Sequence, residues 1–98
     1  MSLVLALKVN DRDNVATLFA DGVHAGDEVE VRDKKGHAQR ILVLGDIPYG
    51  HKLALEDIEF KQPIIKYGEE LGVASRAIRK GDYVHVHNLD SMRGRGDL

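Results

Sequence analysis

A spaced pattern of one glycine and three aliphatic residues occurs three times in this 98-residue chain. In each copy an aliphatic residue precedes a glycine by three positions, and aliphatic residues follow that glycine after three and five positions. The copies are Val23, Gly26, Val29 and Val31; Ile47, Gly50, Leu53 and Leu55; and Ile78, Gly81, Val84 and Val86. Glycine adopts positive φ at little cost, and residues two apart in a strand share a face. The pattern therefore predicts three turns, each leading into a strand that faces a core.

One copy cannot bury its apolar face alone, so the three copies must pack together in a single small domain. The chain also has an apolar first strand over residues 3–9 and a predicted hairpin of 28–31 with 37–44 around a polar, glycine-containing loop. A further short strand is expected over 64–67. These elements predict a mainly β fold that closes into a compact, twisted structure.

Two segments favour other local structure. Asp13 or Asn14 is suited to cap a short helix, in which Val15, Leu18 and Phe19 share one face that covers the sheet. Residues 71–77 are expected to form a turn or a single helical turn before the third copy.

Composition excludes several functional classes. The formal charge is -2 with charges of both signs interspersed, which disfavours nucleic-acid and membrane-surface binding. The chain has no cysteine, so thiolate metal sites and cysteine nucleophiles are excluded. Its longest apolar runs are far shorter than the roughly 18 residues of a membrane span, and no secretion signal is recognised at the amino terminus. The expected location is the cytoplasm.

The third copy carries the residues best suited to chemistry. Strand alternation would place Tyr83, His85 and His87 on the face opposite the valines, and His51 lies in the equivalent second copy. Histidines so arranged can bind a metal, yet they are more commonly solvated or hydrogen-bonded on a polar face. A position facing a partner's active site is the favoured interpretation.

Lys52 and Lys66 each lie beside a glycine-containing turn and can bind a carboxylate, although lysine is ordinarily a solvated surface residue. The acidic pairs Glu56-Asp57 and Glu69-Glu70 are interpreted as surface charge, because neighbouring strand residues diverge. The usual phosphate-binding, hydrolase and metalloprotease motifs are absent from the sequence, which argues against a self-contained enzyme.

Three ordered stretches carry a family resemblance: residues 47–58, residues 65–69 and residues 81–89, which contain Gly50-His51-Lys52, Ile65-Lys66-Tyr67-Gly68 and His85-Val86-His87-Asn88. With these stretches the chain resembles the amino-terminal module of altronate and galactarate dehydratases, a member of the SAF superfamily that includes antifreeze-like domains. The resemblance implies a β-clip fold with short helices. It places the SAF domain at residues 1–90 and an Arg/Gly-rich connector or tail at 91–98.

The resemblance implies a small subunit or amino-terminal domain of a metal-dependent sugar-acid dehydratase, a hydro-lyase that forms a 2-keto-3-deoxy acid and is not active without its larger catalytic partner. The divalent metal, iron or manganese, is expected mainly on that partner, where it stabilises the enediolate formed by proton abstraction. The positions matching the motifs are expected to face the active site. They are His51, His85 and His87 as catalytic residues, and Lys52, Lys66, Tyr67 and Asn88 as substrate-binding residues.

Two alternatives remain open. The small subunit of sulfolactate sulfo-lyase, which expels sulfite instead of water, shares the same three stretches. The Arg/Gly-rich sequence of residues 93–98 favours the dehydratases over it. A non-catalytic SAF binding module is the other alternative, although such a module does not need histidines beside lysines. Self-association is also expected if the face for the larger partner is left uncovered.

Overall fold

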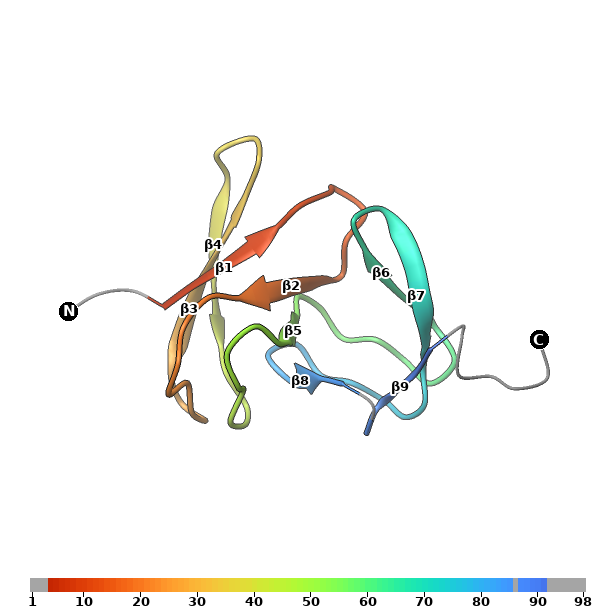
Figure 1. Cartoon of the computed structure of the whole chain (residues 1–98). Coiled ribbons are helices and arrows are strands. Elements are labelled where there is room, and N and C mark those ends of the chain that lie inside the picture. The colour runs from red at the N-terminus through yellow and green to blue at the C-terminus, as the bar shows by residue number, and fades with distance from the viewer. Residues whose placement is uncertain (1–3, 86, 92–98) are drawn as a thin grey trace.

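The computed structural model describes residues 4–85 and 87–91, and within them the chain forms nine strands and no helix (Figure 1). The strands are β1 (Val4–Lys8), β2 (Val15–Leu18), β3 (Glu28–Asp33), β4 (Ala38–Leu42), β5 (Lys52–Ala54), β6 (Pro63–Lys66), β7 (Glu69–Ala74), β8 (Tyr83–Val84) and β9 (Leu89–Ser91). The mainly β prediction is confirmed, whereas the expected short helices are not found in the described residues. That part of the chain accordingly offers no helix able to cross a membrane.

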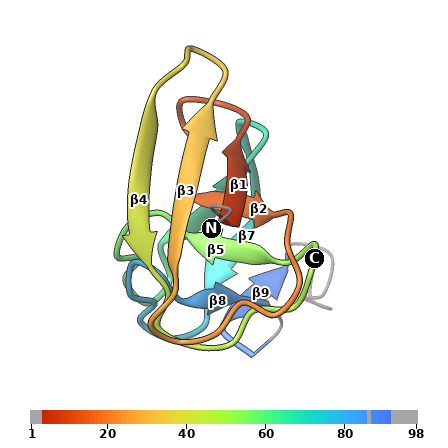
Figure 2. The same ribbon diagram turned by 90° about the vertical axis from the view of Figure 1, so that its left-hand side faces the viewer.

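The strands form two sheets. Six of them follow the order β4-β3-β1-β2-β5-β8, and the other three follow the order β6-β7-β9. Strands β1 and β3 pair in parallel, while the other neighbours pair antiparallel. Figure 1 shows the small sheet beside the β5–β8 end of the larger one, and in Figure 2 the predicted β3–β4 hairpin rises at the opposite edge. The curled, turn-rich architecture agrees with a β-clip.

The glycine repeat predicted the turns and the core correctly. Gly26, Gly50 and Gly81 have φ values of 94°, 78° and 95°. Every aliphatic member of the repeat that the structure describes is buried, with no more than 6% of its surface exposed. Isolated bridges join Val23 to Ile47 and Ile58 to Ile78, so the starts of the first two copies are direct neighbours. Val86 lies outside the described residues.

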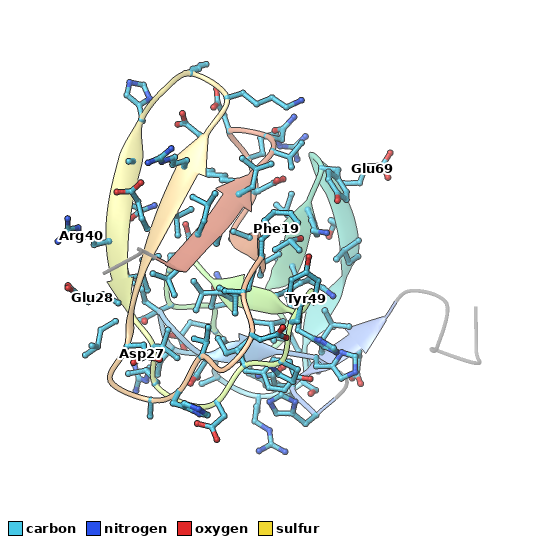
Figure 3. The ribbon with its side chains drawn as sticks, turned by 60° about the vertical axis from the view of Figure 1, so that its left-hand side comes forward. Phe19, Asp27, Glu28, Arg40, Tyr49 and Glu69 are labelled. Atoms are coloured by element: carbon cyan, nitrogen blue, oxygen red, sulfur yellow. The ribbon has the colours of Figure 1, made fainter. Side chains whose placement is uncertain are left out.

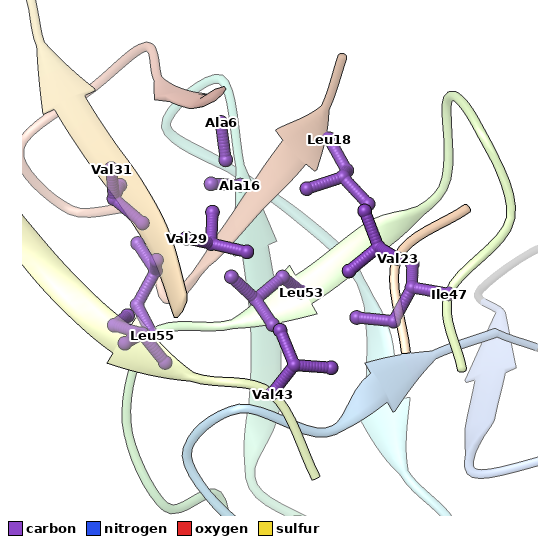
Figure 4. Packing of buried hydrophobic residues seen from close by; sticks show 11 residues of the cluster. Ala6, Ala16, Leu18, Val23, Val29, Val31, Val43, Ile47, Leu53 and Leu55 are labelled. Atoms are coloured by element: carbon purple, nitrogen blue, oxygen red, sulfur yellow. The ribbon is translucent and has the colours of Figure 1, made fainter. Parts of the chain in front are cut away.

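Strands β2 and β5 separate two hydrophobic cores. Ala16, Leu18 and Leu53 pack in the first core, part of which Figure 4 shows, whereas Val15 and Ala54 pack in the second. Because both faces of these two strands are covered, their sequences lack the polar alternation of a half-exposed strand.

This double burial explains why the helix predicted after Asp13 and Asn14 is wrong. Residues 15–18 form β2, which pairs with β1 and β5, and Phe19 is 47% exposed instead of covering the sheet. The spacing of apolar residues in 15–18 is compatible with either a helix or a buried strand. The strand forms because β1 and β5, which are distant in the sequence, pair with this segment.

The turn or helical turn expected at 71–77 is also wrong over its first part. Residues 69–74 form β7, which is hydrogen-bonded to β6 on one side and β9 on the other. The connector predicted at 91–98 lies outside the described residues, apart from Ser91 at the end of β9.

Candidate functional site

The pairing of β5 with β8 brings two histidines together. Lys52 lies opposite Val84 and Leu53 opposite Tyr83, so the same register continued by one position sets His51 against His85. Their ring centroids are 4.8 Å apart and the rings are nearly perpendicular, at 78°. Because this contact depends on strand pairing, residues 34 positions apart in the sequence become immediate neighbours.

Tyr83 connects the remaining rings. Its ring lies nearly parallel to that of His85, with centroids 5.7 Å apart, and its centroid is 5.4 Å from His51 and 5.1 Å from His87. We call His51, Tyr83, His85 and His87 the histidine cluster. The prediction that Tyr83, His85 and His87 lie on one side is confirmed, although β8 ends at Val84 and His87 lies in a turn.

The cluster lowers the basicity of its central imidazole. Partial burial lowers the pKa of His85 below its usual 6.5, and the neighbouring His51, Lys52 and His87 lower it further by repelling a positive charge. A histidine with a lowered pKa is largely neutral near pH 7, and a neutral imidazole can accept a proton.

Asn88 ends β8 and fixes the turn that follows. It is 4% exposed, its side-chain oxygen accepts a hydrogen bond from the His85 N–H at 3.0 Å, and its side-chain NH₂ donates to the Tyr83 carbonyl at 2.8 Å. The amide therefore holds the backbone on which two members of the cluster are mounted.

The same turn recurs along the chain. In each instance the N–H of the fourth residue donates to the carbonyl of the first, while the side-chain oxygen of the fourth accepts from the N–H of the first. The first and fourth residues are Asn10 and Asp13, His24 and Asp27, Glu59 and Gln62, Arg79 and Asp82, and His85 and Asn88.

The turn from Pro48 to His51 keeps only half of this pattern. His51 N–H donates to the Pro48 carbonyl at 3.2 Å, but proline has no N–H for a side chain to accept. The fourth position is thus released from the need for Asp, Asn or Gln and carries an imidazole. The His51 Nδ1 atom lies 3.1 Å from the Tyr49 carbonyl oxygen, which orients the ring.

Two lysines adjoin one another and the histidine cluster. The charge of Lys52 acts on His85, and the charge of Lys66 acts on Lys52. Burial lowers the pKa of Lys52, the charge of Lys66 lowers it further, and Tyr67 acts in the opposite direction. Lys66 Nζ donates to the Tyr67 hydroxyl at 3.1 Å and lies 4.2 Å from the centre of that ring. We call Lys52 and Lys66 the lysine pair.

Asp13 anchors the turn that presents Lys66 and Tyr67. Tyr67 and Gly68 both have positive φ, at 56° and 75°, and the buried Asp13 carboxylate accepts the Gly68 N–H at 2.8 Å. A Cβ on Gly68 would meet the side chain of Asn10 at 2.9 Å. Backbone of this kind persists where the surroundings hold it, so Asp13 positions Lys66 and Tyr67.

Asn14 fixes the adjoining strand. Its side-chain oxygen accepts from the Ile65 N–H at 2.8 Å, and its NH₂ donates to the Pro63 carbonyl at 2.9 Å. Asp13 and Asn14 therefore cap no helix; their side chains join the loop before β2 to the β6–β7 hairpin.

The acidic pairs take no part in this arrangement. Glu56, Asp57, Glu69 and Glu70 are exposed, as predicted, and Figure 3 shows Glu69 at the outer end of the small sheet. Within the described residues, no group of three or more His, Asp and Glu side chains is arranged to hold a metal ion. The three cluster histidines therefore do not by themselves provide a metal site.

The sequence reasoning missed three contributors. Strand alternation grouped Tyr83 with the histidines, but its role as the ring that contacts all three was not predicted. Pro48 could have been recognised from the sequence, because the other turns of this type begin with a residue that has a backbone N–H. Asp13 gave no usable signal, because an Asp before an apolar run is equally typical of a helix cap.

Comparison with known proteins identifies a family. Residues 4–92 match the model of the altronate/galactarate dehydratase SAF domain. The (2R)-sulfolactate sulfo-lyase subunit alpha of Chromohalobacter salexigens is 38% identical over 88 residues, covering 87% of this chain and 93% of that subunit. Altronate dehydratase of Escherichia coli is 39% identical over 99 aligned positions, covering 94% of this chain and 19% of the enzyme. Galactarate dehydratase (L-threo-forming) of the same organism is 42% identical over 79 residues, covering 80% of this chain and 14% of the enzyme.

Proposed function

This chain belongs to the altronate/galactarate dehydratase SAF domain family, and we propose that it is the small subunit or amino-terminal domain of a metal-dependent sugar-acid dehydratase. The enzyme would convert altronate or galactarate into a 2-keto-3-deoxy acid, with most of the chemistry on a larger partner. The proposed location is the cytoplasm.

The observation that carries the proposal is the packing of three histidines around Tyr83, with Lys52 close enough for its charge to act on His85 and Lys66 close enough to act on Lys52. In the described part of the chain, no carboxylate forms an ion pair with Lys52 or Lys66. Burial lowers the pKa values of Lys52 and His85, and repulsion from neighbouring positive charges lowers them further; an anion would relieve that repulsion. A sugar acid supplies that anion as its carboxylate.

The proposed roles follow from the two groups. The lysine pair binds the substrate carboxylate, and Tyr67 orients Lys66 through their hydrogen bond. His85, largely neutral near pH 7, accepts the proton on the carbon next to the carboxylate, and His51 or His87 protonates the departing hydroxyl. Loss of that proton and of the hydroxyl gives an enol and water, and the enol becomes the 2-keto-3-deoxy acid. Asn88 acts through the backbone of Tyr83 and His85.

We propose that iron or manganese is bound mainly by the larger partner, since the described residues of this chain do not form a metal site.

Two exposed aromatic rings support a face that binds this partner. Phe19 is 47% and Tyr49 is 58% exposed, and Figure 3 shows both on one side of the molecule. The N–H of Gly50, which follows Tyr49, donates to the carbonyl of Leu18, which precedes Phe19. This hydrogen bond holds the two aromatic residues close together. Self-association through this face is expected when the partner is absent.

The proposal is tested by measuring 2-keto-3-deoxy acid formation from altronate and galactarate with iron(II) or manganese(II). The samples are this chain alone, the larger partner alone, and both together. Activity confined to the mixture supports the proposal. His85→Ala and His87→Ala should then lower turnover, whereas Arg40→Ala on the β3–β4 hairpin should not. The absence of dehydration in every sample would reject it.

A second candidate is the small subunit of a sulfolactate sulfo-lyase. It is favoured by one observation, namely that the chain spans 93% of the sulfo-lyase subunit alpha. Release of sulfite from sulfolactate by the same mixture would establish this alternative. If neither water nor sulfite is released, a non-catalytic binding module becomes the best explanation.

A further inference from the structure

A groove adjoins the histidine cluster. Its volume is about 330 Å³, and its walls come from the loop after β4, the turn after β7 and the β8 region. The lining residues are Gly45, Asp46, Arg76, Ala77, Asp82, Tyr83, His87 and Asn88. Tyr83 and His87 belong to both the groove and the cluster, so a ligand that contacts the cluster can extend into the groove.

The groove offers acceptors and a donor. One oxygen of Asp46 lies 3.1 Å from His24 Nδ1, and one oxygen of Asp82 accepts the Arg79 N–H at 2.9 Å. The second oxygen of each carboxylate has no hydrogen-bond partner in the described part of the chain. Arg76 adds a planar guanidinium with several N–H donors, and its side chain is exposed.

This composition selects for hydroxyl groups. Carboxylate oxygens accept strong hydrogen bonds from hydroxyls, and a guanidinium donates to the hydroxyl oxygens. Two carboxylates and only one guanidinium line the groove, so it repels a further anion and disfavours a sulfonate. A chain bearing several hydroxyls satisfies both the acceptors and the donor.

We propose that this groove is the subsite for the hydroxylated carbon chain of a sugar acid, with Asp46, Asp82 and Arg76 as its specificity-determining contacts. The inference rests on the proposed function, because it takes the substrate carboxylate to lie at Lys52 and Lys66. It deepens that function by separating sugar acids from short acids such as sulfolactate, whose few carbons do not fill the groove.

The test compares long and short acids on the assembled enzyme. Asp46→Ala and Arg76→Ala should each raise the KM for the sugar acid at least tenfold. The same variants should leave the inhibition constant of glycerate within twofold, because this short acid binds only at the cluster and the lysine pair. Arg40→Ala is the matched surface control. Unchanged KM values, or equal losses for long and short acids, would overturn the inference.

A second measurement separates this inference from the proposed function. Altronate and glycerate are titrated into the ¹⁵N-labelled full chain, and the amide shifts of Gly45 and Ala77 are followed. Shifts at these amides with altronate but not with glycerate support the subsite, even if the assembled enzyme dehydrates neither altronate nor galactarate. Altronate shifts confined to residues near Lys52 and His85 overturn the subsite and leave the proposed function standing.

Discussion

Pro48 and His51 are the first and last residues of one turn, joined by a hydrogen bond from the His51 N–H to the Pro48 carbonyl at 3.2 Å. In the corresponding turn of the third copy, the Asp82 carboxylate also accepts the Arg79 N–H. Because proline lacks that N–H, the fold makes no structural demand on the side chain at position 51. An imidazole can therefore occupy the position at no cost to the turn.

A double-mutant cycle tests this relationship. His51→Asp alone gains no hydrogen bond, since Pro48 offers no donor, whereas the Pro48→Ala background restores the N–H that an Asp can accept. We expect a favourable coupling of about 1 kcal/mol between the two substitutions, similar to that of other turn and cap bonds. The coupling is measured by urea unfolding of the four proteins. A coupling near zero would show that the turn does not explain the histidine.

The glycines of the repeat should differ in their tolerance of a side chain. A Cβ on Gly81, at φ 95°, would clash with the Leu42 carbonyl oxygen, whereas a Cβ on Gly50, at φ 78°, meets nothing within 4 Å. Gly50→Ala is expected to cost about 1 kcal/mol of unfolding free energy from backbone strain alone. Gly81→Ala should cost at least twice as much, because the backbone must also move. Equal losses in urea unfolding would contradict the close approach of Gly81 to Leu42.

Much of the fold could be predicted because the repeat is local. A glycine at positive φ and aliphatic residues two apart determine a turn and a strand within a few residues, as Gly26, Val29 and Val31 show. The run from Val15 to Leu18 could not be assigned in this way. Its conformation depends on pairing with β1 and β5 and on burial of both faces, which are properties of the assembled sheet.

The candidate site likewise contains contacts that local sequence predicts and contacts that depend on the assembled sheets. Alternation along the strand placed Tyr83 and His85 together, and this needed only local geometry. The contact of His51 with His85 required the register between β5 and β8, which the repeat suggested but did not determine. The contribution of Asp13 to the turn that presents Lys66 and Tyr67 connects residues 55 positions apart and left no local pattern.

The pKa of His85 gives a prediction for the pH dependence of stability. Its pKa is lowered in the folded chain, so as the pH falls below about 6.5 the unfolded chain takes up this proton first. Stability should therefore fall as the pH is lowered from 6.5 through the folded-state pKa. His85→Gln should make the decline in Tm over this range shallower. An NMR titration that finds the His85 pKa at or above 6.5 would contradict the effect of burial and of the neighbouring His51, Lys52 and His87.

Lys66→Gln should increase stability while it reduces function. The substitution removes a positive charge that lowers the Lys52 pKa, so that pKa should rise, although burial keeps it below its usual value. The Tm near neutral pH should increase at low salt, and added salt should shrink the increase because it screens the repulsion. The wild-type chain gains stability as the pH rises through the folded-state pKa of Lys52 towards 10.5, and this gain should be smaller in the variant.

The functional cost of Lys66→Gln should appear in substrate binding. Loss of one of the two ammonium groups that face the carboxylate is expected to raise the KM of the assembled enzyme about tenfold or more, a cost that corresponds to at least about 1.4 kcal/mol. Lys34→Gln, in the exposed loop of the β3–β4 hairpin, is the matched control and should change neither the Tm nor the KM appreciably. An unchanged KM for the Lys66→Gln enzyme would show that Lys66 does not bind the substrate carboxylate. This conclusion holds whatever the effect on Tm, because Tm depends on the repulsion between the two lysines, whereas KM depends on binding of the anion.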